Sequence, residues 1–303
     1  MTSDAALSAD QLKPLLTYQP QPSTTVLKLP PLACDTHVHI FGPADRFPYA
    51  PTRSFTPVDA PKEMLFALHL QQGIERCVIV QSLVHGMDNR VVEDAIAAGG
   101  GRYLGVSLVP VDVPDAELER IAMAGIRGVR FHFMPSLTSD TSMNAIVALT
   151  QRLKPFNLHL QVHFDGALIH QLIEPLSRSA VPVVIDHMGR VDATRGAEHA
   201  DFAALLTLLN NPKFHVKVSG IDRIDSFGSQ KQPPYADGVA FARLLVERFP
   251  EQCVWGTDWP HPNHTHVPDD GVLLDALSSI APTPELLAQL LVHNPQRLYR
   301  FAE

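Results

Sequence analysis

The chain has 303 residues, of which 45% are hydrophobic, and a formal net charge of −8. The composition is typical of a globular protein, and the acidic balance argues against a general role in binding nucleic acid or anionic membranes. No window approaches the roughly 18 consecutive apolar residues of a membrane span, and the first residues lack a secretory signal pattern. Cys34, Cys77 and Cys253 are odd in number and far apart, which predicts a reducing, cytoplasmic setting without disulfides.

The pattern along the chain predicts one repeating alternation of strands and helices. Residues 1–31 are polar and rich in proline, so we expect an extended N-terminal arm there and a single domain over 32–303. The predicted strands are 33–41, 77–82, 103–110, 128–133, 159–164, 181–189, 214–220 and 253–259. The predicted helices are 60–73, 88–100, 115–125, 142–155, 165–179, 200–212 and 235–250. This order predicts the α/β class and a single (β/α)8 TIM-like barrel. A doubly wound sheet is the alternative, but the segment HIFGPADRF is not the glycine-rich turn such a sheet usually shows after its first strand.

The first predicted strand contains CDTHVHIF, residues 34–41, with His37 and His39 two positions apart. Side chains at i and i+2 of a strand point to one face, so we expect the two imidazoles to lie together, with Asp35 on the same face. Packing alone would favour Val or Ile at both positions. The pair therefore indicates a metal site or a catalytic site.

Polar residues also follow the other predicted strands, at the end where a barrel of this kind has its active site. In chain order these residues are Gln81, His85, Arg130, His163, His187, Arg190, Arg223 and Asp258. The apolar pattern alone defines these strands, so the polar residues at their ends are partly independent support for one common site. His261, in the tract HPNHTH, lies close enough to Asp258 in sequence to be a further candidate, whereas His264 and His266 indicate a solvated loop.

Six other histidines fall at positions typical of structural residues. His69, His170, His199 and His293 lie in helical patterns. His159 and His215 lie at strand starts, at the opposite end of the barrel from the expected site. We interpret all six as structural.

Five segments together resemble the amidohydrolase superfamily: DTHVHIFGP, VIVQSLVHGMDN, GIRGVRF, VVIDHMGR and VWGTDWPHPN. More narrowly they are similar to the amidohydrolase-2 group, which contains the 2-pyrone-4,6-dicarboxylate lactonases and related sugar-lactone and sulfomuconolactone hydrolases. The resemblance runs from about residue 33 to the C-terminal HNPQRLYRF. It implies a distorted (β/α)8 barrel, hydrolysis of a cyclic ester, and an aspartate at the position of Asp258 that acts on the attacking water.

The resemblance leaves two versions of the site open. The pyrone-dicarboxylate lactonases work without a metal and have tyrosine at the position of His163. Relatives with a single zinc, such as the aminocarboxymuconate semialdehyde decarboxylases, have histidine there and use a strand-six histidine for proton transfer. This chain matches the zinc pattern at His37, His39, His163 and Asp258, with His187 for proton transfer. Imidazoles and a carboxylate suit zinc, so we expect one divalent metal, preferably zinc, with a metal-free site as the alternative.

The resemblance also implies how the substrate is held. Three arginines match positions that bind substrate carboxylates in the lactonases: Arg130, Arg190 and Arg223. The planar guanidinium suits a carboxylate, and His85 and His261 are further substrate-binding candidates. Three other partner positions differ, since Phe55 replaces a tyrosine, Leu83 a serine and Ser136 an arginine. We therefore expect a related acidic lactone in place of 2-pyrone-4,6-dicarboxylate itself.

The function that follows is hydrolysis of a small carboxylate-bearing lactone, of the pyrone-dicarboxylate, sulfomuconolactone or sugar-acid type. Asp258 takes a proton from the attacking water, the metal or His187 stabilises the oxyanion, and His187 or Asp258 protonates the leaving oxygen. The alternatives are a decarboxylase, a lactone isomerase, a metal-free lactonase and a small-acid binding protein. The sequence predicts no nucleic-acid or membrane partner and is compatible with a homo-oligomer.

Overall fold

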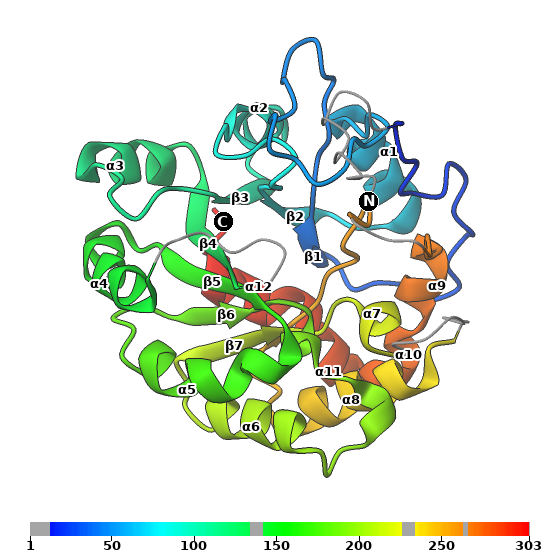
Figure 1. Cartoon of the computed structure of the whole chain (residues 1–303). Helices are drawn as coiled ribbons and strands as arrows, with labels where there is room; N and C mark the ends of the chain where they lie inside the picture. The colour runs from blue at the N-terminus through cyan, green and yellow to red at the C-terminus, as the bar shows by residue number, and fades with distance from the viewer. Residues whose placement is uncertain (1–12, 134–141, 226–233, 263–265, 303) are drawn as a thin grey trace, which may run out of the picture.

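Eight parallel strands surround the centre of the molecule in the order of the chain (Figure 1). The computed structural model describes residues 13–133, 142–225, 234–262 and 266–302. The strands are β1 Cys34–Val38, β2 Arg76–Val80, β3 Tyr103–Ser107, β4 Ile126–Phe133, β5 His159–Phe164, β6 Val183–Ile185, β7 Phe214–Lys217 and β8 Cys253–Val254. Every strand pairs with its sequence neighbours. The predicted (β/α)8 barrel is confirmed.

The helices between the strands lie on the outside of the barrel (Figure 1). Those that connect consecutive strands are α1 Lys62–Gln72, α2 Arg90–Ala98, α3 Asp115–Met123, α4 Met143–Leu153, α5 Ile169–Ser177, α6 Ala200–Leu209 and α8 Ala236–Arg248, together with the short α7 Ile221–Asp225. After β8 come α9 Asp270–Asp275, α10 Leu277–Ile280, α11 Pro284–Ala288 and α12 Asn294–Tyr299. In the described parts of the chain, no helix is both long enough and apolar enough to cross a membrane.

Alternation along the strands separates two hydrophobic regions. In β2, Cys77 and Ile79 pack in the large core that includes the helices. Val78 and Val80 belong to a second cluster that fills the barrel, together with Tyr299 of the C-terminal segment. This alternation is the period-two pattern of a strand that is buried on both faces.

The ring closes through an irregular segment after β8, which is only two residues long although the sequence predicted a strand over 253–259. The Thr36 N–H donates to the Trp255 carbonyl at 2.8 Å, and the His39 N–H donates to the Trp259 carbonyl at 2.6 Å. Between these bonds, the Asp258 N–H donates to the His37 carbonyl at 2.8 Å. This closure fixes Asp258 directly beside the H-x-H pair.

One local prediction in β1 is wrong. The register of β1 against β2 shifts between Asp35 and Val38, so the alternation that placed Asp35 beneath the two histidines does not hold. Its carboxylate instead accepts the Thr257 hydroxyl at 2.6 Å and lies 3.9 Å from His69 of α1. Asp35 therefore belongs to the packing between the strand and α1.

The described part of the N-terminal segment, from residue 13, is extended and tied to the barrel at two places. Leu15 exchanges backbone hydrogen bonds with Thr56 and Val58. Further along, the Ser23 and Thr25 hydroxyls bond to the carboxylates of Asp269 and Asp275 at 2.9 and 2.6 Å. These contacts connect the segment to the loop after β1 and to α9.

Candidate active site

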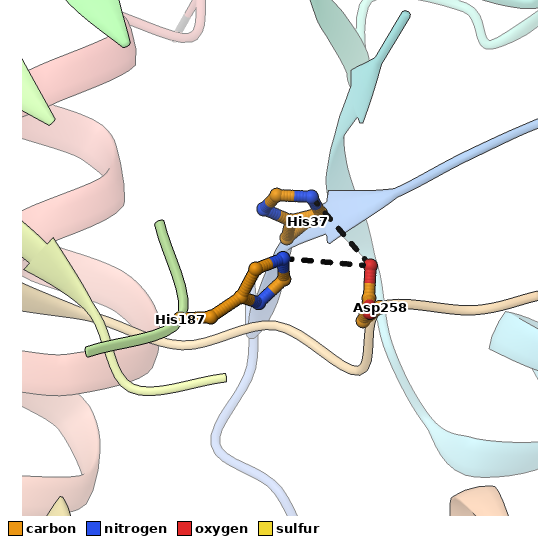
Figure 2. Close-up of side chains that lie close together, drawn as sticks. All are labelled: His37, His187 and Asp258. Carbon is orange, nitrogen blue, oxygen red and sulfur yellow. Dashed lines mark ion pairs between the residues drawn. The ribbon is translucent and has the colours of Figure 1, made fainter. Parts of the chain in front are cut away.

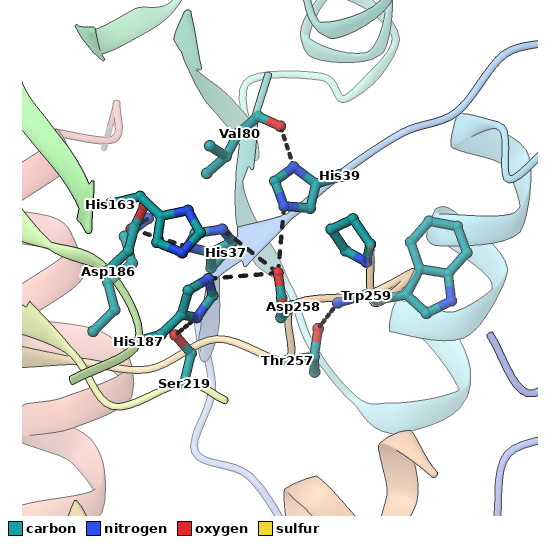
Figure 3. Close-up of polar contacts among 12 residues, drawn as sticks. His37, His39, Val80, His163, Asp186, His187, Ser219, Thr257, Asp258 and Trp259 are labelled. Carbon is teal, nitrogen blue, oxygen red and sulfur yellow. Dashed lines mark hydrogen bonds and ion pairs between the residues drawn. The ribbon is translucent and has the colours of Figure 1, made fainter. Parts of the chain in front are cut away.

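The Nε2 atoms of three histidines point at one carboxylate oxygen, Asp258 Oδ1 (Figures 2 and 3). The distances are 3.3 Å from His39, 3.6 Å from His37 and 3.9 Å from His187. The four residues come from β1 and the position directly after it, from the turn after β6 and from the segment after β8, and none is more than 2% exposed. The barrel thus brings these four predicted residues together.

Left-handed backbone after β6 and β8 positions two of these side chains. The sequence predicted a strand over 181–189, but β6 ends at Ile185 because His187 and Met188 have φ values of 49° and 51°. Asp258 has φ 68°. Such conformations cost of order 1–3 kcal/mol for residues other than glycine and collect at functional sites. Here they turn His187 and Asp258 toward the H-x-H pair.

The acceptors that face the H-x-H pair indicate which ring nitrogens carry protons. His39 Nδ1 is hydrogen-bonded to the Val80 carbonyl at 2.7 Å. His37 Nδ1 faces an oxygen of Asp186 at 3.3 Å, a contact without hydrogen-bond geometry. Both partners are acceptors, so each Nδ1 is the donor in the neutral ring. Burial lowers the pKa of both imidazoles and keeps them neutral. Each Nε2 therefore presents a lone pair toward Asp258.

Asp258 is a negative centre in this cluster. Burial by itself would raise the pKa of Asp258, but Arg223 and His187 outweigh burial and hold it well below its usual range. Arg223 binds the other carboxylate oxygen through Nε at 2.7 Å and through Nη2. Asp258 Oδ1 and His37 Nε2 have no hydrogen-bond partner among the described residues. Lone pairs and a carboxylate oxygen thus face one another in a buried space.

This donor set fits a divalent metal ion. One ligand atom each from His37, His187 and Asp258 lies within 4.8 Å of the others. Neutral imidazoles and an ionised carboxylate are the protonation states that metal binding requires. A cation among these atoms would also remove the repulsion between the lone pairs and the carboxylate. The residues therefore fit a single metal ion.

His39 and His163 both lie beside this group of ligand atoms, but neither is part of it. Arg130 Nη2 lies 3.2 Å from His163 Nδ1, and arginine can only donate, so Nδ1 is the acceptor. Burial lowers the pKa of His163 well below its usual value, and the neutral ring then carries its proton on Nε2. This buried N–H has no partner within the described parts of the chain. In this arrangement His163 presents a donor and not a metal-binding lone pair.

A second buried carboxylate, Asp186, supports the cluster, and the sequence analysis missed it. It accepts hydrogen bonds from Arg130 Nε at 2.8 Å and from Gln161 Nε2 at 3.2 Å, beside its contact with His37. Lys217 Nζ lies 3.8 Å away. Burial would raise the pKa of Asp186, but Arg130 and His37 hold it well below its usual range. The available signals were charged residues at positions 186 and 217 inside otherwise apolar runs.

An amidohydrolase family model matches residues 34–301. A 2-pyrone-4,6-dicarboxylate hydrolase from Comamonas testosteroni is 41% identical over 290 residues, which is 94% of this chain and 95% of that protein. The chain belongs to the amidohydrolase family, and it is an enzyme. A 4-sulfomuconolactone hydrolase from Hydrogenophaga intermedia is 40% identical over 275 residues, 89% of each chain. A related crystal structure is that of a probable 2-pyrone-4,6-dicarboxylic acid hydrolase from Acinetobacter baumannii with citric acid bound. It superposes on this chain with a TM-score of 0.79 at 26% sequence identity, and the match covers 89% of this chain and 100% of that chain.

The three candidate arginines of this amidohydrolase differ in their partners. Arg130 binds Asp186, and Arg223 binds Asp258 and also the Pro262 carbonyl at 3.0 Å. Arg190 follows His187 in the left-handed turn, and its Nε is buried without a hydrogen-bond partner among the described residues. Arg190 is therefore the guanidinium with the most free hydrogen-bonding capacity for an anionic ligand.

The other predicted site residues of the amidohydrolase also lie at this end of the barrel. His85 accepts the Gly42 N–H at 3.2 Å, and its second ring nitrogen lies 3.2 Å from the Pro48 carbonyl. His261 is fully buried 3.1 Å from Asp270, which raises its pKa although burial opposes this. His85 thus contacts the loop after β1, and His261 contacts the first residue of α9. Ser136 and His264 lie outside the described residues.

Proposed function

We propose that this amidohydrolase opens the ring of a small lactone that carries a carboxylate. The observation that carries the proposal is the ionised, buried Asp258 in front of three imidazoles, with an unpaired Arg190 Nε nearby. The names of the relatives, which are hydrolases of 2-pyrone-4,6-dicarboxylate and of 4-sulfomuconolactone, support a lactone substrate with an anionic group. Citric acid in the related crystal structure supports a carboxylate as that group.

For the metal, we propose one divalent ion, zinc by preference, held by His37, His187 and Asp258 with His39 beside them. The convergence of their ligand atoms and the orphaned His37 Nε2 support this set. When bound there, such an ion supplies positive charge that polarises a carbonyl group or water. His163, which the sequence placed among the ligands, acts on the substrate instead.

Three residues of the chain move or hold charge during hydrolysis. Asp258 accepts a proton from water as the water oxygen attacks the lactone carbonyl, while Arg223 holds the second carboxylate oxygen in place. The Nε2–H of His163 donates to the carbonyl oxygen as negative charge develops on it. When the ring C–O bond breaks, Asp258 returns the proton to the ring oxygen. The products are a hydroxyl group and a carboxylic acid, which ionises at neutral pH.

Arg190 binds the carboxylate of the substrate. A guanidinium pairs with a carboxylate through charge-assisted hydrogen bonds, and such a contact fixes the orientation of the lactone relative to Asp258. The buried position of the Arg190 Nε makes the pairing stronger, because water competes little there.

The test is a titration of product protons during turnover with a panel of lactones: 2-pyrone-4,6-dicarboxylate, 4-sulfomuconolactone and paraconate. We expect one proton per ring opened at constant pH, with the hydroxy acid identified by NMR. Release of carbon dioxide would instead show a decarboxylase, and conversion to another lactone without proton release would show an isomerase. Either result contradicts the proposal.

For its cellular setting we propose the cytoplasm, with a small acidic lactone as the partner and no nucleic acid or membrane. Cys34, Cys77 and Cys253 are all free and buried, which supports a reducing compartment. A homo-oligomer is compatible with this proposal. Light scattering on the purified protein measures its mass in solution.

A further inference from the structure

A cavity of about 400 Å³ opens next to the active site, above the C-terminal ends of β2, β3 and β4. This volume lies in the range of small-molecule sites. Most of its wall is apolar and comes from the loops after β2 and β3 and from β4: Leu83, Leu108, Val109, Val111 and Phe131. Met87, which is 58% exposed, also lines it. The cavity thus offers an apolar wall with an adaptable thioether at its edge.

The cavity borders on His163 through two residues of its wall. Its polar wall includes Arg130 and His132, two positions apart on β4. Arg130 contacts His163 Nδ1, and the His132 ring lies 5.5 Å from the His163 ring. His163 in turn lies 5.3 Å from His187, centroid to centroid. A lactone placed at Asp258 and His163 therefore has a substituent within reach of the cavity.

The charges around the cavity do not favour a second carboxylate. Arg130 is engaged through Nε with Asp186 and through Nη2 with His163. Burial lowers the pKa of His132 well below its usual value and leaves it neutral. Asp112, which is exposed, adds a negative charge to the wall. By contrast, the free guanidinium nitrogen of Arg190 lies in the turn after β6.

We propose that the cavity receives an apolar substituent of the substrate, so that the substrate class is a lactone with one carboxylate and one alkyl or aryl group. The carboxylate pairs with Arg190, and the apolar group lies against Leu83, Leu108 and Val111. This inference rests on the proposed lactonase function for the position of the ring. Leu83 is a residue at which the chain differs from the pattern of the pyrone-dicarboxylate lactonases, and its side chain suits an apolar group.

The first test compares two lactones that differ in one substituent, paraconate and phenylparaconate. Each methylene removed from water is worth about a factor of four in binding, so a buried phenyl ring should raise kcat/KM by at least about tenfold. Leu83→Ser should reduce this preference by about fivefold, chiefly through KM for phenylparaconate. The matched control is Leu70→Ser, at an 85% exposed position on α1, which should leave the preference unchanged.

The second test needs no catalysis, and it separates failure of the cavity proposal from failure of the lactonase proposal. Calorimetry of the wild-type protein should give a Kd at least about tenfold lower for phenylsuccinate than for succinate, and Leu83→Ser should remove most of that advantage. If lactones are opened with no advantage for either phenyl compound, the cavity proposal is wrong and the lactonase proposal stands. If phenylsuccinate keeps its Leu83-dependent advantage while no lactone is opened, the cavity is an apolar subsite and the lactonase proposal fails.

Discussion

Buried histidines occupy both ends of this barrel, and their neighbours differ. At the C-terminal end, His37 and His187 face Asp258 at 3.6 and 3.9 Å. At the N-terminal end, His159 lies edge-on to the Tyr299 ring at 5.5 Å, and the charged side chains that shift its pKa are Lys217 and Arg300. Burial lowers the pKa to about 3 for His187 and His159 alike. The carboxylate, and not the neutral buried imidazole, therefore distinguishes the candidate site.

This contrast agrees with the general arrangement of (β/α)8 barrels, in which the active site lies at the C-terminal face and the opposite face contributes to stability. It also makes the two ends separable by experiment. Changes at the C-terminal end should alter turnover, metal binding or substrate choice, whereas changes at the N-terminal end should alter the free energy of unfolding.

The largest expected effect is at the carboxylate. Asp258→Asn removes the proton acceptor while keeping its shape, and it should lower kcat by at least about 100-fold. Steady-state kinetics on the best lactone of the panel measures this. The control is Asp45→Asn, at an exposed loop position, which should retain wild-type kinetics. A variant at 258 with more than a tenth of wild-type turnover would show that the carboxylate is not central.

The next effect concerns His163 as a donor. His163→Phe removes the Nε2–H and should lower kcat by about 100-fold, the usual cost of losing one donor to an oxyanion. His163→Tyr should recover part of this loss, because the phenol can also donate. Metal content by mass spectrometry should stay at the wild-type value in both variants. A metal affinity that falls tenfold or more would instead make His163 a ligand, as the sequence pattern predicted.

Metal binding itself should depend on His37 and not on His159. Protein purified without chelator should contain close to one divalent ion per chain. His37→Gln should weaken metal affinity by at least about 10–100-fold, since even residues that only support a ligand have effects of that size. His159→Leu is the matched control and should bind metal normally. If the wild-type protein holds no metal and strong chelators leave its activity unchanged, the histidines of the cluster contact substrate directly.

The sequence predicted the architecture well because eight apolar runs separated by helical patterns are a local property of the chain. It could not predict where β6 and β8 end. His187 and Met188 turn left-handed, and Asp258 is placed by a backbone bond to His37 from the other end of the chain. Those features depend on closure of the barrel.

The candidate site shows the same limit at the level of single atoms. The rule that polar residues gather at strand ends found His163 and His187, but it could not say which nitrogen of each ring is free. Arg130 decides this for His163, while Asp186, missed in the sequence, faces Nδ1 of His37. Arg130 lies on β4 and Asp186 in the turn after β6, so only the folded chain shows these contacts.

Substrate choice should respond to Arg190. Arg190→Ala removes the free guanidinium, and it should raise KM for an acidic lactone by about tenfold or more, as expected for a lost hydrogen bond to a charged group. A neutral lactone such as butyrolactone should be affected much less. Arg195→Ala, at an exposed position in the same connection, is the control. Equal losses on acidic and neutral lactones would make Arg190 a structural residue.

At the N-terminal end we expect no effect on activity: His159→Leu should leave kcat unchanged and should alter the dependence of stability on pH. The pKa of His159 is 6.5 in the unfolded chain and about 3 in the folded protein. Between these values the unfolded state binds the extra proton, so the free energy of unfolding falls as the pH drops below about 6.5. From pH 7 to pH 5 this one group should lower the free energy of unfolding of the wild-type protein by about 2 kcal/mol.

Since leucine does not titrate, urea unfolding of His159→Leu should show a smaller loss of unfolding free energy over the same interval, with kcat unchanged. An identical loss in both proteins would mean that His159 is not neutral and buried as the structure has it, and a fall in kcat would extend the active site to the opposite end of the barrel.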